Sequence, residues 1–286
     1  MFSENTSVKK VALVTGSSSG IGFETSLALA RSGFYTYAAI RNMNDSDELT
    51  KIFKEERLPL ETIQIDVTND ESIKKAINRI QVEKNRIDVL VNNAGYALAG
   101  PLEETSMEEI RTQFETNFFG AIKAMRLVIP IMRKQRSGKI VNITSMGGRI
   151  AVPLDSIYHG TKFALEGVSE CIRYELGSFG IKIILVEPGA VGSNFWKNLK
   201  VASKSKDSQS PYRKIIDNVS EVFSKMTENV IHPSEVAKII VNAVTIENPE
   251  FRCIVGNDAK MILDTKAKIS EKEFEDFMKD QFKLAY

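Results

Sequence analysis

The feature that most constrains the fold is a regular alternation of short apolar runs with longer segments of helical periodicity, unbroken to about residue 187. Short runs rich in β-branched residues predict buried strands, and the longer segments predict amphipathic helices. We expect strands at 11–14, 34–40, 62–65, 89–91, 140–143, 181–186 and 252–255, and helices at 20–31, 46–56, 71–84, 107–133, 156–178 and 234–244. This pattern predicts an α/β protein with a doubly wound parallel sheet of about seven strands and helices on both faces.

The length of 286 residues is compatible with a single domain over 1–286. Two segments depart from the alternation, one at 192–229 and a C-terminal extension at 257–286. In the first, lysines and serines surround Phe195, Trp196 and Leu199, so it is either a lid over a substrate pocket or a solvated surface insertion. Within the helix 107–133, Pro130 predicts a kink or an early end.

Charge and cysteine content argue against several classes of protein. Lys plus Arg number 38 and Asp plus Glu 37, so the net charge of the protein does not favour binding to nucleic acid or to an anionic membrane. Cys171 and Cys253 are too few for a disulfide framework, and neither the cysteines nor the histidines have the spacing of metal ligands. Since no apolar stretch has the length of a signal peptide or a membrane helix, we expect a cytoplasmic protein without metal or membrane span.

A glycine-rich turn connects the first expected strand to the first expected helix. Such a turn directs backbone N–H groups and the positive end of the helix toward a pyrophosphate, and its missing side chains allow close approach. The alternative is a tight structural turn, but its place between strand and helix favours a dinucleotide site. The residues expected to contact the cofactor here are Gly16, Ser18, Ser19, Gly20, Ile21 and Gly22.

The residue after the second expected strand indicates which dinucleotide is bound. An NAD enzyme normally places an acid there for the ribose 2′-hydroxyl, whereas this chain has Arg41. A guanidinium can hold the additional 2′-phosphate of NADP in a bidentate pair. Arg41 therefore favours NADP(H), and the alternative is a solvated Arg41 with Asp45 or Asp47 reaching the ribose.

Two more strand ends carry residues that suit a cofactor, because open α/β sheets bind ligands at the carboxyl ends of their strands. Polar and small residues follow the third and fourth expected strands, although the second group can also be a simple turn. The residues expected to contact the cofactor here are Asp66, Val67, Asn93, Ala94 and Gly95.

Ser145, Tyr158 and Lys162 form a second constellation. Ser145 follows the fifth expected strand, and Tyr158 and Lys162 are four residues apart on one face of a helix. A tyrosine has an ordinary pKa of about 10 and exchanges protons near neutrality only beside a positive charge, which Lys162 provides. Tyr158 is then a general acid or base, and Ser145 stabilises charge on the substrate oxygen. The alternative for the helical pair is an ordinary surface contact.

The chain resembles the short-chain dehydrogenase/reductase family. The motifs are Thr-Gly-x-x-x-Gly-Ile-Gly at 15–22, Asn-Asn-Ala-Gly at 92–95, Asn117, Ser145, Tyr-x-x-x-Lys at 158–162 and Pro-Gly at 188–189. The resemblance implies a Rossmann fold and a catalytic tetrad of Asn117, Ser145, Tyr158 and Lys162, with Lys162 also on the nicotinamide ribose. It further implies a nicotinamide pocket that includes Pro188, Gly189, Val191 and Ser193. Relatives commonly have Thr at the position of Ser193.

The function that the resemblance implies is NADP(H)-dependent interconversion of an alcohol and a carbonyl on a small molecule. The stretch 148–176 is similar to members acting on hydroxysteroids, retinoids or other lipophilic alcohols. The family also implies a homodimer or homotetramer, assembled on the helices 107–133 and 156–178. The alternative is a non-catalytic NADPH-binding sensor or scaffold. We interpret His159 as structural and His232 as a helix-entry residue.

Overall fold

The computed structural model describes residues 9–193, 195, 198–226 and 230–286. Its main element is a sheet of seven strands in the order β3-β2-β1-β4-β6-β7-β9, in which every neighbouring pair is parallel. The strands are β1 (Val11–Thr15), β2 (Tyr35–Ile40), β3 (Leu60–Gln64), β4 (Val89–Asn92), β6 (Gly138–Ile143), β7 (Ile181–Pro188) and β9 (Arg252–Val255). The doubly wound fold expected from the alternation is confirmed.

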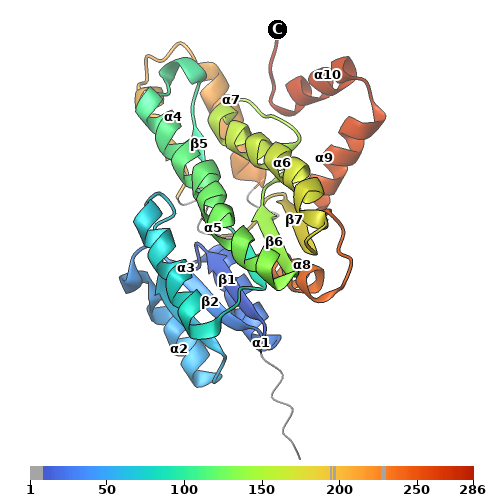
Figure 1. Ribbon diagram of the computed structural model, residues 1–286. Coiled ribbons are helices and arrows are strands. Elements are labelled where there is room, and N and C mark those ends of the chain that lie inside the picture. The colour runs from blue at the N-terminus through green and yellow to red at the C-terminus, as the bar shows by residue number, and fades with distance from the viewer. Residues whose placement is uncertain (1–8, 194, 196–197, 227–229) are drawn as a thin grey trace, which may run out of the picture.

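Helices cover both faces of this sheet (Figure 1). One face packs on α3 (Asp70–Lys84), α5 (Gly120–Gln135) and α6 (Ser156–Gly177), whose apolar side chains join those of the strands in one core cluster. A second cluster on the other face contains side chains of α1 (Gly20–Arg31) and α8 (Pro233–Thr245). Farther along that face, α1 also packs near α2 (Asp47–Glu55) around Leu49 and Ile40. The strands are therefore buried on both faces, which explains their continuous apolar runs.

The expected helix 107–133 is helical throughout but contains a widened turn. It consists of α4 (Met107–Phe114), a π-helical segment (Glu115–Phe119) that was not predicted, and α5. The early end that was one of the two outcomes predicted at Pro130 does not occur, because α5 continues through it to Gln135. Pro130 removes the N–H partner of the Arg126 carbonyl, but both residues are exposed, so water can satisfy that oxygen.

The segment 192–229 is more regular than its composition suggested. A short strand, β8 (Lys200–Val201), pairs in parallel with β5 (Leu98–Ala99). A helix that was not predicted, α7 (Arg213–Met226), buries Ile216 and Val219. The segment 192–229 therefore holds a packed helix, and Trp196 lies outside the described residues.

The C-terminal extension forms α9 (Asn257–Lys268) and α10 (Glu271–Gln281), on the right of Figure 1. The residues after α10 contact α7: the rings of Phe282 and Phe223 are 6.3 Å apart, and Lys283 pairs with Glu221 at 2.7 Å. The far end of the chain thus supports the helix in the segment 192–229. Among the described residues, no helix is long and apolar enough to cross a membrane.

Candidate active site

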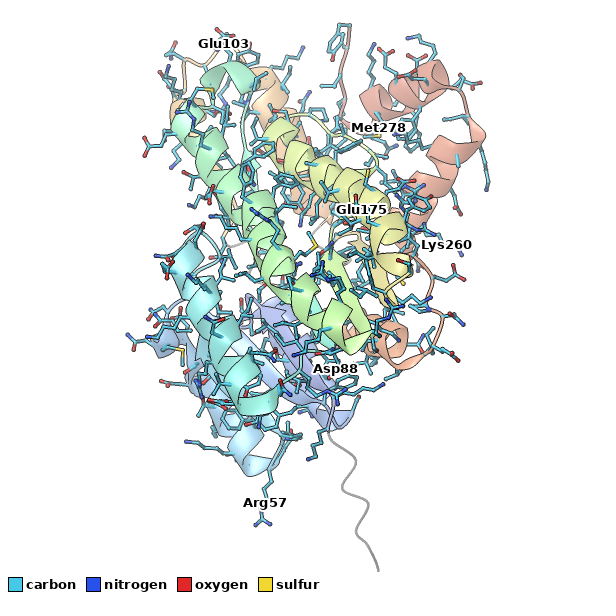
Figure 2. All side chains as sticks on the ribbon, viewed as in Figure 1. Arg57, Asp88, Glu103, Glu175, Lys260 and Met278 are labelled. Carbon is cyan, nitrogen blue, oxygen red and sulfur yellow. The ribbon has the colours of Figure 1, made fainter. Side chains whose placement is uncertain are left out.

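The strand ends indicated by the sequence meet at one edge of the sheet. The strands are parallel and their order changes direction between β1 and β4, which is where open α/β sheets bind ligands. The glycine turn follows β1, Asn93 follows β4, Ser145 follows β6 and Pro188 ends β7. Asp88 lies at the opposite edge, just before β4, where its carboxylate accepts the N–H of Val11 at 2.7 Å (Figure 2).

The glycine turn between β1 and α1 has no room for side chains. Gly16 and Gly20 have positive φ angles of 70° and 60°, a conformation that other residues adopt only at a cost. A Cβ atom on Gly22 would lie 2.2 Å from the carbonyl oxygen of Gly16. Ser19 occupies the N-cap of α1, but its side chain makes no capping hydrogen bond, so it leaves the first helical N–H groups to an anion. The turn fits a pyrophosphate.

Thr15 and Asn93 hold this turn against the end of β4. The hydroxyl of Thr15 accepts the N–H groups of Asn93 at 3.0 Å and Ala94 at 3.1 Å. The side-chain amide of Asn93 donates to the carbonyl oxygens of Thr15 and Gly16 at 2.9 and 3.0 Å. The Asn93 amide therefore stabilises the turn, and what this segment can offer a ligand is mainly its backbone and Gly95.

Arg41, Asp66 and Val67 follow the adjacent strands β2 and β3. Arg41 is exposed and free to reach a ligand with its guanidinium. One oxygen of the Asp66 carboxylate already accepts the N–H and the hydroxyl of Thr68, at 2.9 and 2.7 Å. Val67 is buried against Gly120, where an added Cβ would lie 2.8 Å from the Val67 Cβ. The structure thus brings all three residues to the edge where the sequence analysis expected them.

Ser145 and Tyr158 are brought together across this edge. The Ser145 hydroxyl accepts the N–H of Gly147 at 3.0 Å, and the presence of this hydroxyl lowers the pKa of Tyr158. Burial has the larger and opposite effect, and the nearby Asp155 adds to it, so the pKa of Tyr158 is raised above its ordinary value. The phenol is protonated at neutral pH in the protein alone.

Lys162 lies one turn along α6 and is buried. Its ammonium donates to the carbonyl oxygen of Ile143 at 2.8 Å and lies 5.7 Å from the centre of the Tyr158 ring. Burial lowers the pKa of Lys162 to about 8, and Glu166 opposes this effect. From the sequence we expected the ammonium, together with the positive ring of oxidised nicotinamide, to bring the pKa of Tyr158 toward neutrality. In the protein alone burial prevails, so that expectation holds only if a further positive charge is present.

Asn117 lies in the π-helical segment, a local widening that is frequent at functional sites. Its side-chain amide donates to the carbonyl oxygen of Tyr96 at 2.8 Å, and its oxygen accepts the N–H of the same residue at 3.1 Å. The amide also reaches the hydroxyl of Thr161 on α6, at 3.3 Å. A cavity of about 10 Å³, lined by Asn117 and Lys162 among others, lies beside it and has the size of one water molecule.

The segment after β7 closes the edge of the sheet. Pro188 accepts a hydrogen bond from the Ser145 hydroxyl at 3.4 Å, which links β6 to β7. Gly189 lies against Asp258, since a Cβ there would be 2.2 Å from a carboxylate oxygen. Val191 is buried, and Ser193 packs over the glycine turn, where a Cβ on Gly20 would meet its Cβ at 2.9 Å. The structure therefore places this segment next to the turn.

Both histidines have the structural roles that we expected. His159 is buried, its Nδ1 contacts the Gly147 carbonyl oxygen at 2.6 Å, and its Nε2 accepts the N–H of Val152 at 3.3 Å. These partners hold the ring neutral with its proton on Nδ1, and burial lowers its pKa. His232 is the N-cap of α8 and accepts the N–H of Ser234.

Two further residues affect Tyr158. The ring of Phe195, which the sequence placed in the possible lid 192–229, lies 5.8 Å from the Tyr158 ring, a contact that was not predicted. Asp155 precedes α6 and is buried, with its Oδ1 atom lacking a hydrogen-bond partner among the described residues. No pattern in the sequence marks Asp155, because an acid before a helix normally serves as a cap.

This sheet, its glycine turn and the Ser145, Tyr158 and Lys162 cluster define a dinucleotide-binding oxidoreductase. The sequence profile of the family described as short chain dehydrogenase matches residues 10–204. The chain belongs to this family, whose members use a nicotinamide cofactor, so the resemblance noted from the motifs is confirmed.

Named relatives and a solved structure agree with this assignment. The chain is 35% identical to 3-ketodihydrosphingosine reductase of Bacteroides thetaiotaomicron over 86% of this chain and 88% of that protein. It is 34% identical to human retinol dehydrogenase 8, over 85% of this chain and 80% of that one. A crystal structure of a short-chain dehydrogenase from Streptomyces avermitilis has a TM-score of 0.81 and 32% identity, covering 97% of this chain and all of that one.

Proposed function

We propose that this protein is an NADP(H)-dependent oxidoreductase that transfers hydride between nicotinamide and a carbonyl or secondary alcohol of a lipophilic substrate. The observation that carries this proposal is the clustering of three groups: Ser145 acts on the pKa of Tyr158, and the buried ammonium of Lys162 lies 5.7 Å from the centre of the Tyr158 ring. A hydroxyl donor, a phenol and a positive charge beside a nucleotide turn are what carbonyl reduction requires. When bound, the cofactor supplies or accepts the hydride.

Each side chain then has one role. In reduction, the Ser145 hydroxyl donates a hydrogen bond to the substrate carbonyl oxygen, and the Tyr158 hydroxyl gives its proton to that oxygen. The Lys162 ammonium stabilises the phenolate that remains on Tyr158, because opposite charges attract strongly in a buried site. In oxidation the phenolate takes the proton from the alcohol. Asn117 positions a water in the adjacent cavity through which Lys162 exchanges protons with solvent.

The residues around the glycine turn hold the dinucleotide. The turn and the open amino end of α1 bind the pyrophosphate, and the other strand ends contact the adenosine and nicotinamide halves. We assign to this site Gly16, Ser18, Ser19, Gly20, Ile21, Gly22, Arg41, Asp66, Val67, Asn93, Ala94, Gly95, Tyr158, Lys162, Pro188, Gly189, Val191 and Ser193.

Arg41 provides the preference for NADP(H). We expect Arg41→Ala to lower kcat/KM with NADPH by about 10- to 100-fold, the range for a lost charge-assisted hydrogen bond, and to change kcat/KM with NADH little. Initial rates with both cofactors measure this effect. Arg57→Ala is a matched control, since that arginine is exposed and projects from the far end of the molecule (Figure 2). Wild-type enzyme that uses NADH as well as NADPH would refute the assignment.

A lipophilic substrate is supported by the contacts and by the relatives. Phe195 lies against Tyr158, so an apolar group borders the reacting position. The two relatives described above are named for reactions of a ketodihydrosphingosine and of retinol. We infer that 192–229, with α7, covers the substrate.

We also infer one domain over 1–286 and a cytoplasmic location, which suits the free thiols of Cys171 and Cys253.

A spectrophotometric screen tests the proposed function directly. Purified protein is mixed with NADPH and a panel of aldehydes and ketones of increasing chain length, and the loss of absorbance of NADPH is followed. We expect turnover that rises with the apolar length of the ketone. Cofactor binding without oxidation of NADPH by any carbonyl would instead support a non-catalytic sensor.

The exposed aromatic side chains of the central helices support a homodimer or homotetramer. Phe119, Phe163 and Tyr174 are 44%, 43% and 73% exposed, and they lie on the π-helical segment and α6. We expect sedimentation velocity to give a dimer or tetramer, and Phe163→Glu to shift it toward monomer because a charge would be buried in the interface. A wild-type monomer at micromolar concentration would contradict this expectation.

A further inference from the structure

Asp258, in the C-terminal extension, contacts the segment that follows β7. It is the second residue of α9, the helix that begins after Gly256 at the end of β9. Its Oδ2 atom accepts the N–H of Ala190 at 2.7 Å, across 68 residues of chain. Asp258 lies outside residues 10–204, which the family profile matches. The extension therefore reaches the segment that the family motifs assign to the nicotinamide pocket.

Two glycines leave room for the Asp258 carboxylate. A Cβ atom on Gly189 would lie 2.2 Å from both of its oxygens, and a Cβ atom on Gly256 would lie 2.5 Å from Oδ1. A side chain at either position would therefore displace the carboxylate. Gly256 also has a positive φ of 104°, which glycine adopts without steric cost where the chain turns from β9 into α9. The backbone on two sides is thus shaped around this one group.

The N–H of Ala190 depends on this carboxylate. Ala190 is buried, so water does not replace a lost partner. The neighbouring backbone groups are already paired: the N–H of Gly189 donates to the carbonyl oxygen of Val255 at 2.9 Å, and the Ala190 carbonyl oxygen accepts the N–H of Ile231 at 3.1 Å. A buried N–H without a partner is costly, so the segment would shift if the Asp258 carboxylate were removed.

A role in helix α9 alone does not explain this geometry. An acid in the first turn stabilises a helix through the helix dipole, and Asp258 is the acid in the first turn of α9. That interaction needs no particular partner, and the acid can remain in solvent, as Glu271 does in the first turn of α10. The Asp258 carboxylate is instead partly buried and bonded to a strand end outside its own helix.

We propose that Asp258 is a positioning residue for the cofactor, whose carboxylate fixes the segment 188–191 where that segment contacts the nicotinamide half. The inference rests on the proposed function, in which Pro188, Gly189 and Val191 belong to the cofactor site. The position of this segment matters for the rate, because a misplacement of about 1 Å can cost about 100-fold. The C-terminal extension is then part of the cofactor site.

Cofactor affinity tests the proposal without turnover. Isothermal calorimetry gives the Kd of NADPH and that of adenosine 2′,5′-bisphosphate, which lacks the nicotinamide half. We expect Asp258→Ala to raise the Kd of NADPH by about 10-fold and to leave the Kd of the bisphosphate unchanged. Asparagine keeps an acceptor oxygen for the N–H of Ala190, so Asp258→Asn should bind both ligands nearly as wild type does.

The rate of hydride transfer gives a second measurement. In single turnovers with saturating NADPH and a ketone, Asp258→Ala should be slower than wild type by about 10- to 100-fold, and Asp258→Asn should be close to wild type. Asparagine removes the negative charge, so the two variants separate the hydrogen bond from the helix dipole. If Asp258 only stabilised α9, both variants would lower the thermal midpoint alike and neither would change the ratio of the two Kd values.

Controls separate this role from folding. Glu271→Ala removes an exposed first-turn acid from α10 and should change neither the Kd ratio nor the rate. If Asp258→Ala does not fold, Gly189→Ala serves as a second variant, because its Cβ would displace the carboxylate, and it should shift the Kd ratio in the same direction.

Two results would overturn the inference: a Kd ratio equal to that of wild type in the folded variant, or an equal loss of affinity for NADPH and the bisphosphate. NADH and AMP replace these two ligands if wild-type protein prefers NADH. If wild-type protein binds the cofactor but reduces no ketone, the proposed function fails, whereas the Kd ratio still decides the role of Asp258.

Discussion

Tyr158→Phe is expected to lower kcat for carbonyl reduction by about 10²- to 10⁴-fold, the usual range for a lost general acid. The phenol is protonated in the protein alone, because burial raises its pKa. Phenylalanine keeps the ring and its contact with Phe195 but leaves the substrate oxygen without a proton donor. The loss should therefore fall mainly on kcat, with a much smaller change in NADPH affinity.

Single-turnover kinetics and fluorescence titration of NADPH measure these two effects separately. Tyr37→Phe is a matched control, since Tyr37 is fully buried and its hydroxyl bonds to Glu83 at 2.6 Å, away from the proposed site. That variant should lose some stability, because it breaks a partly buried hydrogen bond, but keep its turnover rate. A Tyr158→Phe enzyme as fast as wild type would remove the phenol from the mechanism.

Lys162→Met is expected to lower kcat by about 100-fold. At the observed 5.7 Å between the ammonium and the Tyr158 ring centre, an effective dielectric of about 20 gives roughly 3 kcal/mol of attraction for a phenolate. Methionine fills a similar volume without charge, so this stabilisation of the transition state is lost. Lys139→Met is the matched control, because Lys139 also donates to backbone carbonyls and has a pKa lowered by burial.

The pH dependence gives Lys162 a second signature. The pKa of Lys162 is about 8, so the ammonium is positive below that pH and loses its proton above it. The kcat/KM of wild-type enzyme for reduction should fall as the pH rises through about 8, and Lys162→Met should lack this decline.

Because the folded-state pKa is depressed, the protonated lysine destabilises the fold below pH about 8. Lys162→Met should therefore have a thermal midpoint no lower than that of wild type at neutral pH. If the decline in kcat/KM near pH 8 persists in this variant, the decline belongs to a group other than Lys162.

Much of the fold followed from local patterns. The seven strands lie within a few residues of their predicted positions, because buried parallel strands need continuous apolar runs and the intervening helices need apolar residues at helical spacing. The glycine turn was recognisable because Gly16, Gly20 and Gly22 stand between a strand and a helix. Helix α7 was missed although Ile216 and Val219 have helical spacing, because the polar stretch before them resembles a loop.

The π-helical segment around Asn117 was not predictable. Its sequence is helical in character, and the widened turn arises where the Asn117 side chain bonds to the backbone of Tyr96. That partner is about twenty residues away along the chain. Pro130 shows the reverse case, since the local rule allowed an early end and the helix instead continues to Gln135. Such features depend on contacts that only the assembled fold provides.

The sequence by itself determined the doubly wound sheet, the nucleotide turn and the identity of the Ser145, Tyr158 and Lys162 cluster. These depend on periodicity, on short motifs whose residues are neighbours along the chain or across one helical turn, and, for Ser145, on its place after a predicted strand. Only the tertiary structure decided the electrostatics, since desolvation depends on everything packed around a group. It raised the pKa of Tyr158, lowered that of Lys162 and left one oxygen of the Asp155 carboxyl buried without a hydrogen-bond partner among the described residues.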